Sequence, residues 1–79
     1  RLENEEECYR FFEDLCTINE LQAMAQRYEV ARMLKKGDTY IAVAEKTGAS
    51  SATISRVNRC LLYGAKGYNI AIERENAEK

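Results

Sequence analysis

Residues 51 to 63 carry arginine and small polar side chains at a spacing that would suit contact with nucleic acid. If this segment is helical, an advance of about 100° per residue places Ile54, Val57 and Leu61 on one side. The other side holds small residues at its N-terminal end and two arginines further along: Ala52, Ser55, Arg56, Arg59 and Tyr63. Small side chains let a helix end enter a major groove, and guanidinium groups reach guanine edges or phosphates. The alternative interpretation is a solvated helix face that carries two arginines.

A helix-turn-helix over about residues 39 to 62 is the element that would position these side chains. Val43 and Ala44 end the apolar face of its first helix, and Gly48 lies four residues beyond Ala44. Two helices that cross at a steep angle need a turn residue that tolerates positive φ, and we expect that nothing larger than glycine fits there. Ser50 then follows as an N-cap, because its side-chain oxygen can accept a hydrogen bond from a free backbone amide.

The residues that we expect to contact DNA lie on both helices of this motif and in its turn. Those near the groove floor are Ser50, Ser51, Ala52, Thr53 and Ser55. Those that would hold bases or phosphates are Lys46, Arg56 and Arg59, with help from Tyr40. The first helix otherwise offers Ile41, Ala42 and Ala44, which make no phosphate contacts. A protein-interaction or adaptor module that keeps the helix-turn-helix shape without reading DNA is therefore a second hypothesis.

Composition and charge bound the fold class and the partners. At 79 residues without proline or strand-like alternation, the chain is predicted to be one all-α domain over residues 1 to 79. Its formal net charge of -1 is unusual for a DNA binder and favours the adaptor hypothesis. However, residues 1 to 20 hold seven acidic and two basic residues, whereas residues 21 to 66 hold eight basic and three acidic ones. We expect the acidic part to face away from a duplex or to orient it, unless each charge run is a solvated helix face.

Catalytic and metal-binding chemistry lack the residues they need. The sequence has no histidine, and Cys8, Cys16 and Cys60 show no C-x-x-C spacing, so we expect no metal site. A phosphate-binding glycine loop and a nucleophile beside a base are absent too, so we expect neither a cofactor nor an enzyme. The cysteines lie beside apolar residues, which predicts small core residues in a reducing cytoplasm, with a redox switch as the less favoured alternative.

Nothing in the sequence predicts a membrane segment. No apolar run approaches the roughly 20 residues that a membrane span needs, and the acidic N-terminus is unlike a signal peptide. We therefore expect a cytoplasmic protein without membrane contact. The sequence begins at Arg1 rather than at methionine, so we expect further residues before it.

A short helix before the motif and another after it are also expected. Three glutamates favour the N-terminal end of the first, over residues 5 to 16, because they complement its dipole. The apolar side of this helix is formed by Cys8, Phe11, Phe12 and Leu15. A turn bracketed by Gly64 and Gly67 precedes the last helix, which runs from residue 68 to about residue 78.

A long helix between these elements predicts a homodimer. Thr17 and Glu20 form a capping box at its start, and Gly37 follows its last residue, Lys36. Its polar strip is narrow and consists of Gln22, Gln26 and Glu29. A chain this short covers such an apolar helix poorly, whereas an interlocked dimer covers it on two sides. A two-fold dimer would also present two recognition helices to successive major grooves.

Two sequence runs carry a family resemblance. They are ECYRFFEDLCTINELQAMAQRYEVARMLKKG and TGASSATISRVNRCL. The chain resembles the tryptophan repressor family in these runs, and especially its YerC/YecD-like branch of small bacterial proteins. This resemblance implies an all-α, intertwined homodimer that acts as a repressor-like transcriptional regulator. With the helix-turn-helix, it makes sequence-specific binding of double-stranded DNA the leading hypothesis.

The resemblance also implies a site for a small effector. In the tryptophan-sensing members, two arginines and two threonines bind the amino-acid corepressor, and the matching positions here are Thr17, Arg27, Thr53 and Arg56. The family's pocket glycine is Val57 here, and a serine three residues further on is Cys60. The branched Val57 would narrow an indole slot, and overfilling a packed site costs about 1 to 3 kcal/mol. We therefore do not expect tryptophan as the effector.

Arg27 is a candidate anion-binding residue independently of the family resemblance, because it lies within the apolar arc of the long helix, near Val30 and Leu34. A buried guanidinium requires an anion. The anion would be either the carboxylate of a small effector or, as we favour, an acidic side chain such as Glu20 or one from a partner chain.

Overall fold

The computed structural model describes residues 3–77 and contains five α-helices in that range. They are α1 (Glu5–Leu15), α2 (Ile18–Lys36), α3 (Tyr40–Thr47), α4 (Ser51–Tyr63) and α5 (Gly67–Ala77). No strand occurs within residues 3–77, which confirms the prediction of an all-α fold. None of these helices is both long enough and apolar enough to cross a membrane.

Side-chain oxygens begin four of the five helices by accepting hydrogen bonds from backbone amides. Thr17 Oγ1 accepts from the amide of Glu20 at 3.1 Å, and Glu20 Oε1 accepts from the amide of Thr17 at 2.7 Å, which is the predicted capping box. Ser50 caps α4, also as predicted. Asn4 and Thr39 cap α1 and α3, and neither cap was predicted.

Two helices end at glycines in the left-handed conformation. Gly37 follows α2 with φ 103°, and Gly48 follows α3 with φ 75°, as predicted. A Cβ atom on Gly48 would meet no atom within 4 Å, so the expectation that nothing larger fits there is wrong. The backbone conformation, and not a lack of space, requires glycine at this turn.

Two helix boundaries differ from the prediction by one residue. α1 ends at Leu15, and Cys16 is its C-cap rather than its last residue. α5 begins at Gly67, so this glycine belongs to the helix instead of closing the turn. The predicted end of the last helix near residue 78 lies outside the described residues.

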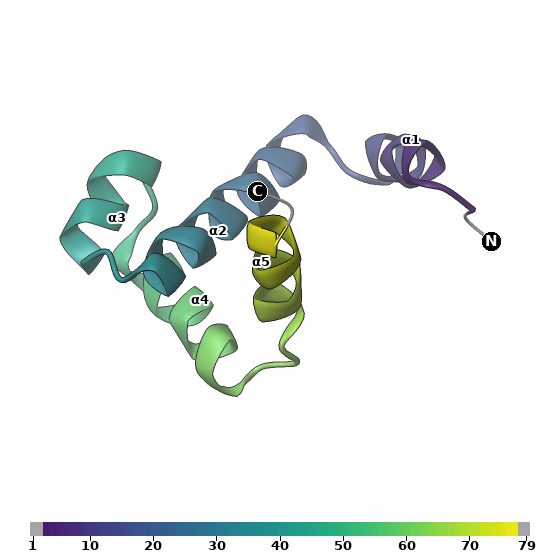
Figure 1. Ribbon diagram of the computed structural model, residues 1–79. Helices are drawn as coiled ribbons and strands as arrows, with labels where there is room; N and C mark the ends of the chain where they lie inside the picture. The colour runs from purple at the N-terminus through teal and green to yellow at the C-terminus, as the bar shows by residue number, and fades with distance from the viewer. Residues whose placement is uncertain (1–2, 78–79) are drawn as a thin grey trace.

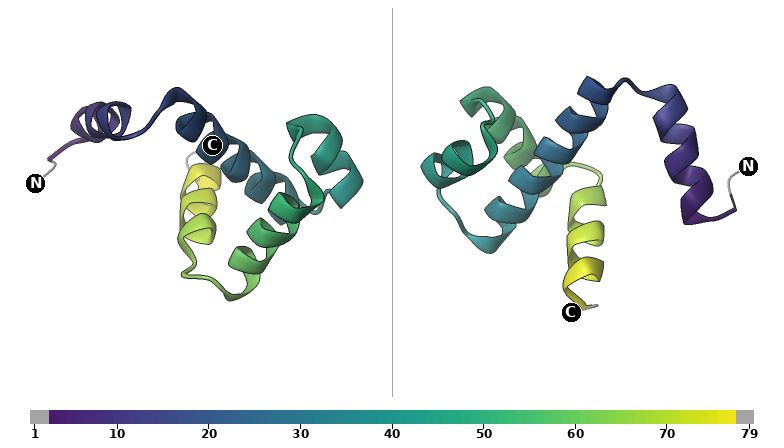
Figure 2. Two further views of the ribbon diagram at one scale, coloured as in Figure 1. Left: turned by 180° about the vertical axis from the view of Figure 1, so that it is seen from behind. Right: turned by 90° about the horizontal axis from the view of Figure 1, so that it is seen from above.

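The C-terminal half of α2 lies at the centre of the fold and contacts α3, α4 and α5 (Figures 1 and 2). Buried apolar side chains from these four helices and from the turn after α3 form the core: Val30, Ala31, Met33, Val43, Ala49, Ile54, Val57, Leu61 and Ile72. α1 has no buried residue and lies beyond the other end of α2, away from α3 and α4 (Figure 1). The core therefore holds the helix-turn-helix against α2 and leaves α1 outside.

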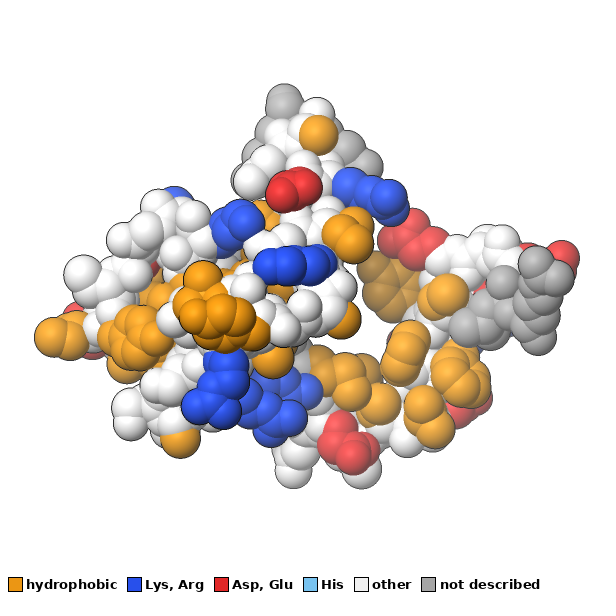
Figure 3. All heavy atoms as spheres, turned by 90° about the horizontal axis from the view of Figure 1, so that it is seen from below, with side chains coloured by type: hydrophobic (Ala, Val, Ile, Leu, Met, Phe, Trp, Pro, Cys, Tyr) orange, Lys and Arg blue, Asp and Glu red, His pale blue; other side chains and the backbone are white. Residues whose placement is uncertain are grey.

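Hydrophobic side chains remain exposed on α1 and on the N-terminal half of α2. They are Tyr9, Phe11, Phe12, Leu15, Ile18 and Met24. Figure 3 shows hydrophobic side chains on both sides of the space between α1 and the rest of the chain. Monomeric proteins rarely leave a large contiguous apolar surface open to water.

The expectation that the cysteines are core residues is wrong for the chain alone. Cys8 and Cys16 are half-buried, because α1 and its C-cap do not pack into the core. Cys60 is exposed, because Val57 and Leu61 already occupy the inward face of α4. All three are free thiols.

Candidate nucleic-acid interface

The turn between α3 and α4 is held by the side chain of Thr47. Its hydroxyl donates to the carbonyl oxygen of Val43 at 2.7 Å and accepts from the amide of Ala49 at 3.2 Å. The amide of Gly48 donates to the carbonyl oxygen of Ala44 at 2.9 Å, which closes α3. Ala49 is itself buried. The direction in which α4 leaves α3 is thus set by hydrogen bonds and by packing, and Thr47 and Ala49 were missed by sequence reasoning.

Burial fixes which side of α4 faces outward. Ile54, Val57 and Leu61 are buried in the core, as the helical spacing predicted. The opposite side is exposed and carries Ser51, Ala52, Ser55, Arg56, Arg59 and Tyr63. Because the three core residues project to one side, rotation of α4 about its axis would expose them. The predicted inward and outward faces of this helix are confirmed.

Arg56 and Arg59 are available for an external partner. Both side chains are exposed, and neither forms an ion pair within residues 3–77. They lie three residues apart, so their side chains are neighbours on the helix surface. Guanidinium groups of this kind pair well with phosphate oxygens and with guanine edges.

The hydroxyl groups predicted at the groove floor divide into two kinds. Ser50 Oγ accepts from the amide of Thr53 at 3.2 Å and donates to Thr53 Oγ1 at 3.1 Å. These two hydroxyls therefore already serve the helix cap, and Thr53 is half-buried. Ser51 and Ser55 are exposed, and their hydroxyls make no hydrogen bond within the described part of the chain.

The first helix of the motif contributes less charge to this face. Tyr40 begins α3 and Lys46 lies in its last turn, and both are exposed. Between them Ile41 is exposed and Val43 is buried. The positive charge of the motif thus comes mainly from α4, with Lys46 as the single basic residue of α3.

Gln26 connects α2 to the end of α3. Its Nε2 atom donates to the carbonyl oxygen of Thr47 at 3.1 Å, and both residues are half-buried. Gln26 and Glu29 belong to the predicted polar strip of α2, and both are half-buried. Glu29 is half-buried and its Oε2 atom lies 2.8 Å from Arg32 Nη1.

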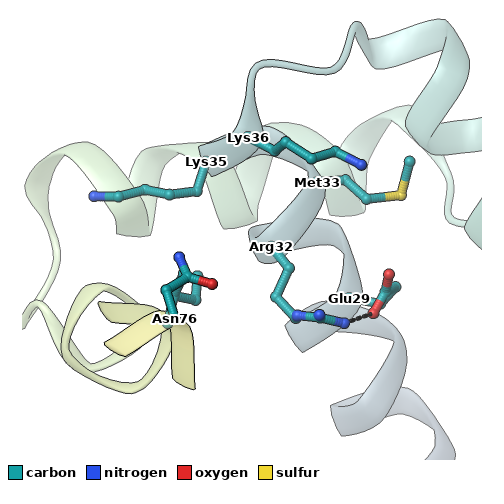
Figure 4. A pocket seen from close by; sticks show the side chains of 7 residues that line it. Glu29, Arg32, Met33, Lys35, Lys36 and Asn76 are labelled. Atoms are coloured by element: carbon teal, nitrogen blue, oxygen red, sulfur yellow. Dashed lines mark hydrogen bonds and ion pairs between the residues drawn. The ribbon is translucent and has the colours of Figure 1, made fainter. Parts of the chain in front are cut away.

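A cavity of about 220 Å³ lies between α2 and α5 (Figure 4). Arg32 in its wall pairs with Glu29 and, at 2.8 Å, with Glu75 of α5. Hydrogen bonding to Glu29, followed by the charge of Glu75, raises the pKa of Arg32. Lys35 and Lys36 point in opposite directions (Figure 4). The polar groups here fasten α5 to α2 and do not converge on one ligand position.

The four predicted effector residues are spread over two helices. Thr17 caps α2, and Arg27 lies ten residues further along the same helix, a separation of about 15 Å. Thr53 and Arg56 lie on α4, and the cavity between α2 and α5 is lined by none of the four. Within one chain, Thr17 and Arg27 therefore lie at well-separated positions along α2.

The environment of Arg27 differs from the expectation. The residue is half-buried rather than buried, and within residues 3–77 it forms no ion pair. Glu20, one of its expected partners, is engaged in the capping box. Hydrogen bonds from Thr17, chiefly from its backbone amide, lower the pKa of Glu20. The pairing of Arg27 with Glu20 is therefore wrong for the single chain.

Comparisons with known proteins define the class of protein. The family model described as Trp repressor protein matches residues 1–76. YerC, an uncharacterized protein of Bacillus subtilis strain 168, is 63% identical over 73 residues, which are 92% of this chain and 70% of YerC. These matches confirm the resemblance to the tryptophan repressor family that the two sequence runs indicated.

Two solved structures share the fold. A candidate Trp repressor from Staphylococcus aureus has a TM-score of 0.82 and 53% identity, covering 95% of this chain and 75% of its own. A TrpR-like protein from Eubacterium eligens has a TM-score of 0.84 and 57% identity, covering 95% of this chain and 77% of its own. The chain therefore belongs to the Trp repressor family.

Proposed function

We propose that this protein is a homodimeric, sequence-specific DNA-binding transcriptional regulator. The observation that carries the proposal is the outward face of α4, where Arg56 and Arg59 are exposed and unpaired within residues 3–77. The buried Ile54 and Val57 on the opposite side hold this face in one orientation. A helix presented in this way suits insertion into a major groove.

The contacts follow from the position of each side chain along α4. Ser51, Ala52 and Ser55 lie toward its N-terminal end and let the helix approach the groove floor. Arg56 and Arg59 then reach bases or phosphates, and Lys46 and Tyr40 add contacts from α3. Ser50 and Thr53 act chiefly through the cap that shapes the end of α4, since their hydroxyls bond to each other.

A homodimer is supported by the apolar surface that the single chain leaves open. Exposed aromatic and aliphatic side chains occur on α1 and on the N-terminal half of α2. Interlocking with a second copy would cover both surfaces and set two α4 helices in a fixed relation. A dimer that binds two DNA half-sites at once has a useful affinity, whereas a single short helix does not.

The effector residues of the family suggest modulation by a small anion at a site shared between chains, formed by Thr17, Arg27, Thr53 and Arg56. Val57 lies buried directly after Arg56 and adds a branched side chain where an indole would need room. Tryptophan is therefore not the proposed effector. Isothermal titration of the purified protein with tryptophan should show no saturable heat, and micromolar binding would contradict this part of the proposal.

A fluorescence anisotropy titration against mixed-sequence duplexes at low salt tests DNA binding. The unmodified protein should bind with an affinity that falls steeply as salt is added, because phosphate contacts release counterions. Arg56→Ala and Arg59→Ala should each weaken binding. Arg74→Ala removes an exposed arginine from α5 and serves as the matched control that should bind normally. If both α4 variants bound as well as the control, this face would not be the interface.

The second candidate is a protein-interaction module that retains the shape of the motif without reading DNA. The observation in its favour is the surface of α3, which exposes Ile41 and carries one basic residue. The same titration separates the two functions, because a DNA reader has at least salt-sensitive nonspecific affinity. Complete silence of the unmodified protein would favour the interaction module.

A further inference from the structure

Apolar contacts hold the helix-turn-helix against α2. Val30 of α2 and Val43 of α3 share the core, and both are fully buried. Each apolar contact is non-directional, so it constrains the angle between the elements less sharply than a hydrogen bond does. A hydrogen bond has a required distance and direction, and it can fix that angle.

Within residues 3–77, the bond from Gln26 Nε2 to the carbonyl oxygen of Thr47 is the one hydrogen bond that joins α2 to α3 or α4. Thr47 is the last residue of α3, so its carbonyl has no partner inside that helix. The Thr47 hydroxyl also accepts from the amide of Ala49 in the turn. The glutamine therefore acts on the residue from which the direction of α4 is set.

We propose that Gln26 is a positioning residue that fixes the angle of the recognition helix relative to α2, and with it the sequence specificity of DNA binding. This inference rests on the proposed function. In the proposed dimer, α2 of each chain would form part of the interface. The connection of α2 to its helix-turn-helix would then govern how the two α4 helices are spaced on the duplex. Loss of the bond should loosen that spacing while every groove-facing side chain stays in place.

Gln26→Met tests the inference, because methionine is similar in size and helix propensity but donates no hydrogen bond. Gln22→Met is the matched control, since Gln22 is exposed and lies one turn earlier on the same helix. The probes are a duplex enriched by the unmodified protein from a randomised pool and a scrambled duplex of equal length. The readout is the ratio of the two affinities, together with the salt dependence of each.

Gln26→Met should lower the ratio of specific to nonspecific affinity by roughly two- to tenfold, the range that corresponds to one lost hydrogen bond. Its nonspecific affinity and salt slope should match those of Gln22→Met. Gln26→Lys restores a donor of similar reach and should recover most of the ratio. A merely structural role would lower thermal stability and leave the ratio unchanged.

A measurement on the unmodified protein covers the case in which Gln26→Met does not fold. In nuclear magnetic resonance, the side-chain amide protons of Gln26 should exchange with water more slowly than those of Gln22, because only the former are bonded. Equal exchange rates, or equal affinity ratios for the two Met variants, would overturn the role of Gln26 but leave the proposed function intact. Absence of salt-sensitive DNA binding by the unmodified protein would overturn the proposed function and this inference with it.

Discussion

Arg56 and Arg59 differ in how far they lie from the end of α4 that would enter the groove. Arg56 is closer to the N-terminal end, so we expect it to contact a base, and Arg59 to contact a phosphate. Arg59→Ala should then flatten the plot of log affinity against log salt by about one unit. Arg56→Ala should cost about 1 to 3 kcal/mol on the preferred duplex and relax specificity. Anisotropy titrations at several salt concentrations measure both effects, and parallel salt lines for Arg59→Ala would contradict the phosphate assignment.

Gly48 is a second residue whose role is local. Its φ of 75° is unfavourable for any residue with a Cβ atom, although the space around it is open. Gly48→Ala should therefore destabilise the fold by about 1 to 2 kcal/mol, the cost of a left-handed residue. Gly67→Ala is the control, because Gly67 also has open space but begins a helix without positive φ. Urea unfolding at one protein concentration compares them, and equal stabilities would show that strain at the turn is not limiting.

The capping box of α2 should make the stability of the fold depend on pH. Hydrogen bonds from Thr17 lower the pKa of Glu20 below its ordinary value of 4.5. A carboxyl with a lowered folded pKa stabilises the fold fully above the ordinary value, and this contribution is lost as the pH falls through the lowered pKa. Glu20→Gln keeps a hydrogen-bonding side chain in the box but does not titrate. In acid unfolding followed by circular dichroism, the unmodified protein should therefore lose more stability below pH 4.5 than the variant.

Acid curves of the same shape for both proteins would contradict this role of Glu20. The two proteins share every other carboxylate, so the difference between them isolates this one group. At neutral pH the unmodified protein should be at least as stable as the variant, because the charged carboxylate also lies near the positive end of the α2 dipole.

The helices could be predicted because the features that begin and end them are local in sequence. Thr17, Ser50, Gly37 and Gly48 act on their immediate neighbours, and all four behave as their residue types require. The outward face of α4 was predictable for a similar reason, since three apolar residues at helical spacing define the opposite side. These signals need no knowledge of how the chain packs.

The environments of other side chains depend on contacts between elements that are distant in sequence. The sequence places Gln26 on a polar strip, but it does not show that Thr47, 21 residues later, lies within hydrogen-bonding distance. Cys60 looked like a core residue because it has apolar neighbours in sequence, but its position on α4 faces outward. Helical periodicity gives the faces of a helix, whereas which face another element covers is decided by the tertiary fold.

In the whole molecule, the acidic helix α1 and the helix-turn-helix lie at opposite ends of α2. The acidic α1 adjoins its N-terminal end, and the helix-turn-helix packs against its C-terminal half (Figure 1). An acidic element placed away from the basic α4 would weaken repulsion from phosphate and help to orient the protein on the duplex. The net charge of -1 is thus compatible with DNA binding.

Assembly can be tested with two exposed hydrophobic residues. Met24 lies in α2 and is 41% exposed, whereas Ile41 lies in α3 and is 73% exposed. Met24→Glu should weaken the homodimer, because it puts a charge into the apolar surface that a second chain would cover. Ile41→Glu should leave the dimer intact although its site is more exposed. Size-exclusion chromatography with light scattering reports the mass of each, and a dimer disrupted only by Ile41→Glu would place the interface on α3.

If the outward face of α4 contacts DNA, titration of a duplex into isotope-labelled protein should identify its residues. With the duplex enriched from a randomised pool, backbone amide signals of residues 51 to 59 should shift or broaden most strongly. Signals of α5, from Gly67–Ala77, should change least. Changes centred on α1 or α5, or no changes at low salt, would show that the outward face of α4 is not the DNA interface.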